Sequence, residues 1–179
     1  MMEAQVGQEV RDGLARIARF PDDIRDVLRG HDDATLSRRA TPPDWSATDV
    51  VCHLRDVEEI VILRFHLMLA TDDPHVFVIG APPPDLAAWG FGDAVPFPLD
   101  PDRWRAERQY DRSDPGRALE AFARRRHEVV TLLTGLTPAQ WERGCVLPTG
   151  ARRRFAEWIA AMAHHGGAHL EQLRETLPA

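Results

Sequence analysis

Apolar residues recur at helical spacing along four long segments, and this pattern limits the possible folds more than any other feature of the sequence. None of these segments contains a polar–apolar alternation long enough to require a β-strand. The helices are expected over about residues 4–30, 46–70, 114–134 and 152–176. The sequence therefore predicts an all-α protein built as a four-helix bundle.

Local signals define several of the helix boundaries. Ser46 is a favourable N-cap, and Asp49, three residues later, can complete a capping box. Asp114 followed by Pro115 is typical of another helix start. Pro21 lies inside the first segment, where a kink or a break is expected. Short turns are expected at 32–38 and 137–141.

A long irregular segment, residues 71–113, separates the second and third helices. It holds seven of the fourteen prolines and, besides Tyr110, five large aromatic residues: Phe77, Trp89, Phe91, Phe97 and Trp104. A loop of this length is usually functional or disordered, and a solvated linker would not carry so many large aromatic side chains. We therefore expect this segment to pack as a cap over one end of the bundle.

The length and composition exclude several classes of protein. A chain of 179 residues is expected to form a single domain, residues 1–179, with a core of its own. The net charge of −6 argues against a nucleic-acid partner, and no run of 18 or more apolar residues predicts a membrane span. The polar N-terminus does not resemble a signal peptide, so Cys52 and Cys145 are expected as reduced thiols in a cytoplasmic protein. All 22 basic residues are arginine, which favours a bacterial source with a GC-rich genome.

Two histidines continue the apolar stripe of the last helix. Trp158, Met162, His165, His169 and Leu173 fall within an arc of roughly 80°, so both imidazoles should face the interior. Because the two histidines are four residues apart, they lie on successive turns and can share one metal ion. His164 points about 100° away and is expected on the surface.

The second helix supplies a third histidine. His53 lies on the buried stripe of that helix, near its start. Asp56 flanks the same face and could orient an imidazole or a bound water. Glu58 projects roughly 140° away and is not expected to touch the site.

Three neutral nitrogen ligands would leave one or more coordination positions open, which is typical of catalytic metal sites. Such ligands suit divalent zinc, nickel, iron or copper. A histidine on an apolar face can instead be a hydrogen-bonded core residue, and the periodicity alone leaves both interpretations open. Gly166 and Gly167 weaken the last helix, which is tolerable if small residues let another helix or a ligand approach closely; a locally loose helix is the alternative.

Four other features have weaker functional interpretations. Tyr110, the only tyrosine, could donate a hydrogen bond to a substrate. His127 is expected at a solvated or half-buried helix position, and the preceding arginine run 124–126 on an exposed face with one member turned inward. The run 152–154 could contact an anion, although a solvated loop is favoured.

Two motifs of the chain resemble those of the DinB-like superfamily, which includes YfiT-type candidate metal hydrolases and thiol S-transferases. The first is similar to W-S-x-x-x-V-x-x-H-L-x-D-x-E, and the second to H-x-x-x-H-x-x-Q. The matching residues are Trp45, Ser46, Val50, His53, Leu54, Asp56, Glu58, His165, His169 and Gln172. The chain departs from the pattern at Gly166-Gly167, where relatives often carry an acidic and a bulkier residue.

The resemblance implies a DinB-like four-helix bundle with a divalent metal ion on His53, His165 and His169. Some members transfer low-molecular-weight thiols such as bacillithiol or mycothiol. The leading hypothesis is an enzyme whose metal activates such a thiol or water, with a small-molecule substrate bound partly by the long loop. The alternative is a metal-binding or small-molecule-binding module of the same fold without turnover, and a homodimer through an outer helix face is also plausible.

Overall fold

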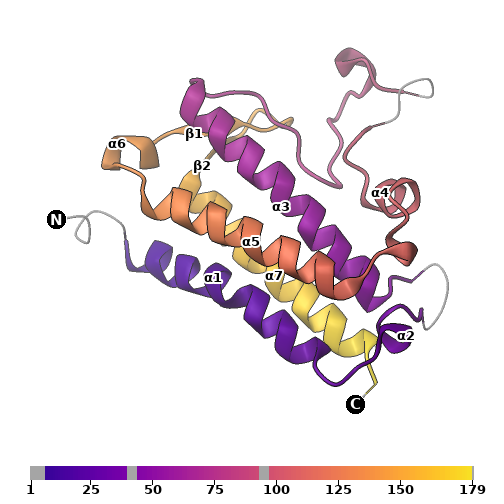
Figure 1. Ribbon diagram of the computed structural model, residues 1–179. Helices are drawn as coiled ribbons and strands as arrows, with labels where there is room; N and C mark the ends of the chain where they lie inside the picture. The colour runs from indigo at the N-terminus through magenta and orange to yellow at the C-terminus, as the bar shows by residue number, and fades with distance from the viewer. Residues whose placement is uncertain (1–6, 40–43, 93–96, 179) are drawn as a thin grey trace.

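The computed structural model describes residues 7–39, 44–92 and 97–178, and four long helices dominate it. They are α1 (Gln8–Leu28), α3 (Ala47–Ala70), α5 (Pro115–Thr134) and α7 (Phe155–Thr176). α3 packs chiefly on α5, and α1 packs on α7 and α5, so the four helices enclose a common interior (Figure 1). The predicted all-α four-helix bundle is confirmed. None of the described helices has the length and apolarity needed to cross a membrane.

Short elements join the long helices. They are α2 (Asp33–Leu36), η1 (Ala87–Trp89), α4 (Pro101–Glu107), η2 (Tyr110–Arg112), α6 (Pro138–Trp141), β1 (Gly144–Val146) and β2 (Arg152–Arg154). α2 and α4 lie at the end of the bundle where α3 begins, whereas α6 and the two strands lie at the opposite end (Figure 1).

The predicted helix starts are confirmed at both capped positions. The Ser46 hydroxyl accepts from the Asp49 N–H at 3.1 Å, and an Asp49 carboxylate oxygen accepts from the Ser46 N–H at 2.9 Å. Asp114 caps α5 by accepting from the Arg117 N–H at 2.8 Å, and Pro115 occupies the first helical position, where its missing N–H costs nothing. These local bonds place the buried stripe of α3, and therefore His53, in a defined register.

The first and last helices differ from expectation. α1 continues through Pro21 without a break, and the first expected residues of that helix, 4–6, lie outside the described residues. The last helix begins at Phe155 rather than Arg152, because Arg152–Arg154 pair antiparallel with Gly144–Val146. The pairing depends on a partner strand eight residues away, which local helical periodicity does not reveal.

Two apolar clusters form the core. One, centred on Phe20, Val50 and Phe122, fills the end of the bundle near the start of α3, and the other, centred on Phe65 and Phe155, fills the opposite end. Glu58 and Arg126 form a buried, two-pronged ion pair between α3 and α5, with N–O distances of 2.6 and 2.8 Å. Arg126 is thus the member of its run that turns inward, as expected.

The sequence suggested that the long segment after α3 caps one end of the bundle, but the structure places it elsewhere. It runs back beside α3 toward α4 (Figure 1). Phe77, Phe91 and Phe97 stack edge to face on one another, with centroids 5.6 to 5.7 Å apart. The Phe77 carbonyl accepts a hydrogen bond from Arg64 on α3 at 2.7 Å. The segment is therefore bonded to α3 and held together by its own aromatic side chains, and it forms a side wall along α3.

Candidate metal centre

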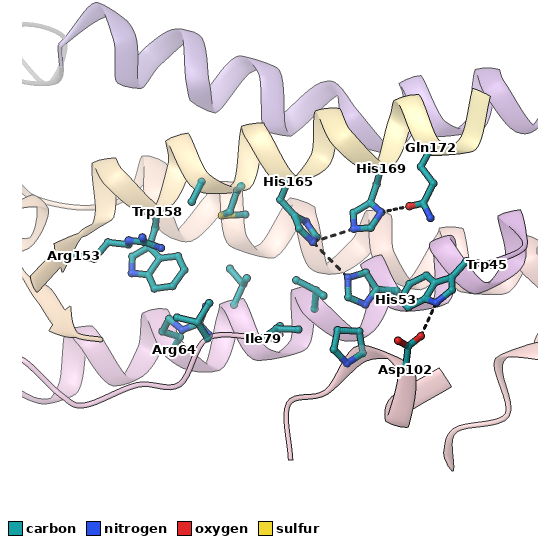
Figure 2. Close-up of a pocket in the computed structure, with 16 residues that line it drawn as sticks. Trp45, His53, Arg64, Ile79, Asp102, Arg153, Trp158, His165, His169 and Gln172 are labelled. Carbon is teal, nitrogen blue, oxygen red and sulfur yellow. Dashed lines mark hydrogen bonds between the residues drawn. The ribbon is translucent and has the colours of Figure 1, made fainter. Parts of the chain in front are cut away.

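The structure brings His53, His165 and His169 together inside the bundle. The Nε2 atom of His165 lies 3.4 Å from that of His53 and 3.1 Å from that of His169. One ring nitrogen from each residue can be chosen so that all three lie within 4.8 Å of one another. Figure 2 shows the three rings pointing toward one another, His53 from α3 and the other two from α7.

The antiparallel course of α3 and α7 explains this convergence. His53 lies in the second turn of α3, whereas His165 lies at the middle of α7 and His169 one turn later, so the opposite directions of the two helices bring all three to the same level of the bundle. His164 is exposed, as the helical register predicted. Among the described residues, no other group of three histidine, cysteine or acidic side chains is arranged to hold a metal ion.

Burial keeps these rings neutral. Loss of solvent, reinforced by the neighbouring rings, lowers the pKa of His53 to about 3 and the pKa of His165 to about 3. Burial also lowers the pKa of His169, although the hydrogen bond with Gln172 opposes the shift. A neutral imidazole is the form that binds metal, so all three side chains are in the protonation state that a cation requires.

Neighbouring side chains orient two of the rings. Nδ1 of His169 donates to the Gln172 amide oxygen at 2.8 Å, which leaves the Nε2 lone pair facing the other histidines. The Trp45 indole packs edge-on against His53 with centroids 5.0 Å apart, and its N–H donates to Asp102 at 2.9 Å. Gln172 and Trp45 both belong to the motifs that carried the histidines.

The donor set fits a divalent metal ion. Tetrahedral nitrogen ligands about 2.05 Å from zinc are separated from one another by roughly 3.3 Å, close to the two Nε2–Nε2 separations above. Without a cation, His165 Nε2 faces two other ring nitrogens, and a single proton cannot bridge all three. A cation can accept all three lone pairs at once. The three rings therefore fit a bound metal ion better than they fit hydrogen bonds to one another.

The predicted contact between Asp56 and an imidazole of the site is not formed. Asp56 is buried, but its carboxylate accepts from Tyr110 at 2.7 Å and pairs with Arg55 and Arg108 at 2.7 and 2.8 Å. It makes no hydrogen bond to His53, whose buried Nδ1 has no partner among the described residues. Burial alone would raise the pKa of Asp56, but these three donors outweigh it and hold the pKa below its ordinary value.

Tyr110 is likewise not available to a substrate. Its side chain is fully buried, and its hydroxyl is committed to Asp56. Burial and the adjacent carboxylate raise the pKa of Tyr110 well above its ordinary value. Asp56 and Tyr110 therefore tie α3 to the end of the long segment, and Asp56 reaches the histidines only through its charge, which raises the pKa of His53 against the effect of burial.

A pocket of about 540 Å³ extends from the histidines between α3 and α7. The long segment closes one side of it with Val78, Ile79, Pro101 and Asp102. The middle of the pocket is apolar, with Val57 and Val61 from α3 and Met162 from α7. Its volume suits a small organic molecule.

The end of the pocket away from the histidines carries Arg64, Arg153 and Trp158 (Figure 2). Sequence reasoning missed Arg64, although a signal was present: His53, Val57, Val61 and Arg64 follow one another at helical spacing on the same stripe of α3. It also favoured a solvated loop for the run that contains Arg153, whereas β2 turns this one side chain to the pocket.

A four-helix bundle with three neutral histidines at the end of a pocket between two of its helices defines a class of helical proteins with a candidate metal site. The sequence profile of the DinB superfamily matches residues 16–173, and the chain belongs to this family.

A protein of Geobacillus thermodenitrificans, named as a candidate metal-dependent hydrolase, is 25% identical over 169 residues, which cover 93% of this chain and 83% of the relative. The solved structure of YfiT from Bacillus subtilis, described as a candidate metal-dependent hydrolase with an unusual four-helix bundle topology, matches with a TM-score of 0.76 at 19% identity. The match covers 97% of this chain and 89% of YfiT. The YfiT likeness supports the fold.

Proposed function

We propose that this protein is a metal-dependent enzyme whose divalent ion, zinc, nickel or iron, is held by His53, His165 and His169. The observation that carries the proposal is the convergence of three neutral imidazoles, that of His53 buried and the other two half-buried, at one end of an apolar pocket. The name of the Geobacillus relative supports the same class of activity. A divalent cation at this position would lower the pKa of a coordinated water or thiol and so supply a nucleophile near neutral pH.

The chain's own residues would prepare this site for reaction. Gln172 fixes the His169 ring with its Nε2 lone pair inward, and Trp45 shields one edge of His53. The apolar side chains of α3 and α7 would exclude water from the space beside the histidines and hold a substrate against them.

A small thiol is the nucleophile that we favour over water. Hydrolysis at a metal site generally needs a general base, commonly a carboxylate, beside the nucleophile. Among the described residues that line the pocket, Asp102 is the only acid, and it is exposed and bonded to Trp45. A thiol ionises far more readily than water and loses its proton outright on a metal, so it does not need such a base.

Metal content tests the site first. Untagged wild-type protein should hold about one divalent ion per chain, and His165→Ala should lose it. His164→Ala is the matched control, because its exposed ring lies outside the site, and this variant should keep the ion. Wild-type protein without stoichiometric metal, or equal metal content in both variants, would contradict the proposal.

A second assay tests the reaction. Wild-type protein should accelerate the consumption of a small thiol by monochlorobimane, and His53→Ala should abolish the acceleration. If metal is bound but no thiol among several tested reacts faster with wild-type protein than with His53→Ala, the protein is a metal-binding module or uses water.

A further inference from the structure

Arg64 occupies the pocket end opposite the histidines and has no charge partner among the described residues. Arg64 is 5% exposed, and its Nη2 donates to the Phe77 carbonyl at 2.7 Å. Its Nε is buried and has no hydrogen-bond partner among the described residues. Burial lowers the pKa of Arg64 to about 10, yet the guanidinium is still protonated at neutral pH. A desolvated cation is therefore held in place with one donor unused.

Arg153 places a second cation beside the first. The guanidinium carbons of Arg64 and Arg153 lie 4.2 and 4.6 Å from the centre of the same Trp158 ring. Neither arginine forms an ion pair within the described part of the chain. The nearby Cys145 thiol, which accepts from the Trp158 N–H at 3.3 Å, offers no counter-charge, because burial raises its pKa.

Other arginines near this end of the bundle are paired. Arg152 and Arg154, which flank Arg153 on β2, pair with Asp73 and Glu142. In a strand, alternate side chains point to opposite faces, so β2 directs Arg153 to the pocket and its two neighbours away from it. Within the described residues, Arg153 is thus unpaired although it lies between two paired arginines on the same strand.

We propose that Arg64 and Arg153 bind the carboxylate of an elongated organic acid whose reacting group lies at the three histidines. The planar guanidinium fork matches a carboxylate, and an anion here would offset the desolvation of two adjacent cations. Trp158 lies two helical turns before His165, a distance of about 10 Å along α7. The apolar walls between the two ends suit an aliphatic or aromatic spacer of similar length.

The position of the reacting group rests on the proposed function, whereas binding of the carboxylate does not. The probe is therefore chosen to test the arginines without chemistry: 6-phenylhexanoate, compared with its neutral isostere 6-phenylhexanamide. Calorimetric titration of the full-length protein, as purified and again after treatment with a chelator, measures both affinities at neutral pH.

Wild-type protein should bind the carboxylate at least tenfold more tightly than the amide in both forms. Arg153→Gln, a half-exposed position that should leave the fold intact, should bring the carboxylate to the affinity of the amide, and Arg64→Gln should do the same. Arg152→Gln is the matched control on the same strand and should bind as wild type.

Equal affinity for the two probes in wild-type protein, no binding of either at millimolar concentration, or unchanged carboxylate affinity in Arg153→Gln would each overturn the proposal. If the protein holds no metal but the arginine-dependent preference is present, the proposed function fails and this inference stands. If metal is bound without that preference, only this inference fails.

Discussion

At the scale of single side chains, the low exposure of the histidines affects both metal binding and the response to pH. Burial that keeps the rings neutral also prevents them from becoming charged without a large free-energy cost. The pKa values of about 3 for His53 and His165 lie far below the ordinary value of 6.5. Without a metal ion, these neutral rings therefore cost the folded protein no stability only at a pH above the ordinary histidine pKa of 6.5.

The stability of the metal-free protein should fall as the pH is lowered from about 6.5 toward 5. In this range the unfolded chain binds protons at His53 and His165 and the folded chain does not, so protonation favours unfolding. The slope should be about half of 1.4 kcal/mol per pH unit for each of these histidines at pH 6.5 and approach the full value near pH 5. Urea unfolding of chelator-treated protein at pH 7, 6 and 5 measures it.

Replacing one of the two rings provides the control for this slope. His165→Gln removes a titrating group and should reduce the slope by about one proton. A free energy of unfolding that stays constant between pH 7 and 5 would show that the buried rings can take up protons within the folded protein.

At the scale of elements, two glycines set the close contact between α1 and α7. A Cβ atom added at Gly13 would lie 2.7 Å from the Ile159 side chain, and one added at Gly166 would lie 3.1 to 3.2 Å from the Phe20 ring. Gly166 thus admits a neighbouring helix, which is one of the two interpretations that the sequence left open. Since α7 carries two of the histidines, this contact also fixes how far along the bundle axis they lie relative to α1.

The adjacent glycines of α7 should respond to alanine in opposite ways. Gly166→Ala should destabilise the protein by about 1 to 3 kcal/mol, because the buried Phe20 ring has little room to move. Gly167→Ala should stabilise it by up to about 1 kcal/mol, because alanine favours the helix and the new methyl group meets only the flexible end of Arg16. Urea unfolding of both variants at pH 7.5 measures the difference, and a shift of the same sign in both would contradict the packing described.

Helical periodicity and capping signals predicted the elements that depend on local sequence. The register of α7 separated His165 from His164, and the register of α3 turned His53 inward. The features that were missed depend on residues distant in the chain. Helical direction placed Asp56 near the site, but it could not reveal that Tyr110 and Arg108, arriving from the end of the long segment, would occupy its carboxylate.

The inward turn of Arg153 was hidden for a similar reason. Three consecutive arginines have no pattern of their own, and only pairing with Gly144–Val146 makes alternate side chains face opposite ways. The path of the long segment along α3 also depends on contacts with distant residues, such as the Arg64 bond to Phe77. Sequence reasoning therefore found one end of the pocket and missed the other.

At the scale of the whole molecule, the described surface exposes little apolar area through which a partner could bind. Leu63 and Leu67 are the large apolar side chains most exposed among the described residues, at 64% and 40%. They lie one turn apart on α3 and form a small patch. A homodimer, a cytoplasmic location, a single domain over residues 1–179 and the absence of a nucleic-acid partner stay predictions of the sequence.

The architecture separates stability from metal binding, because two apolar clusters fill the bundle without using the histidines. Removing the metal should therefore leave the protein folded, unlike small domains that need zinc to fold. A cation that binds only the folded chain, present at 100 times its dissociation constant, adds about 2.7 kcal/mol of stability. For a chain of this size, this corresponds to an increase in Tm of about 5 to 10 °C.

Thermal unfolding followed by circular dichroism, with excess chelator or excess zinc, measures this shift. The helical signal at 25 °C should be the same in both conditions, and His165→Ala should lose the zinc-dependent increase while His164→Ala retains it. Loss of the helical signal on chelation would mean that the metal is structural. An identical Tm shift in the two variants would mean that zinc stabilises the chain somewhere other than the three histidines. The proposed metal site would then be wrong, although the description of the fold would stand.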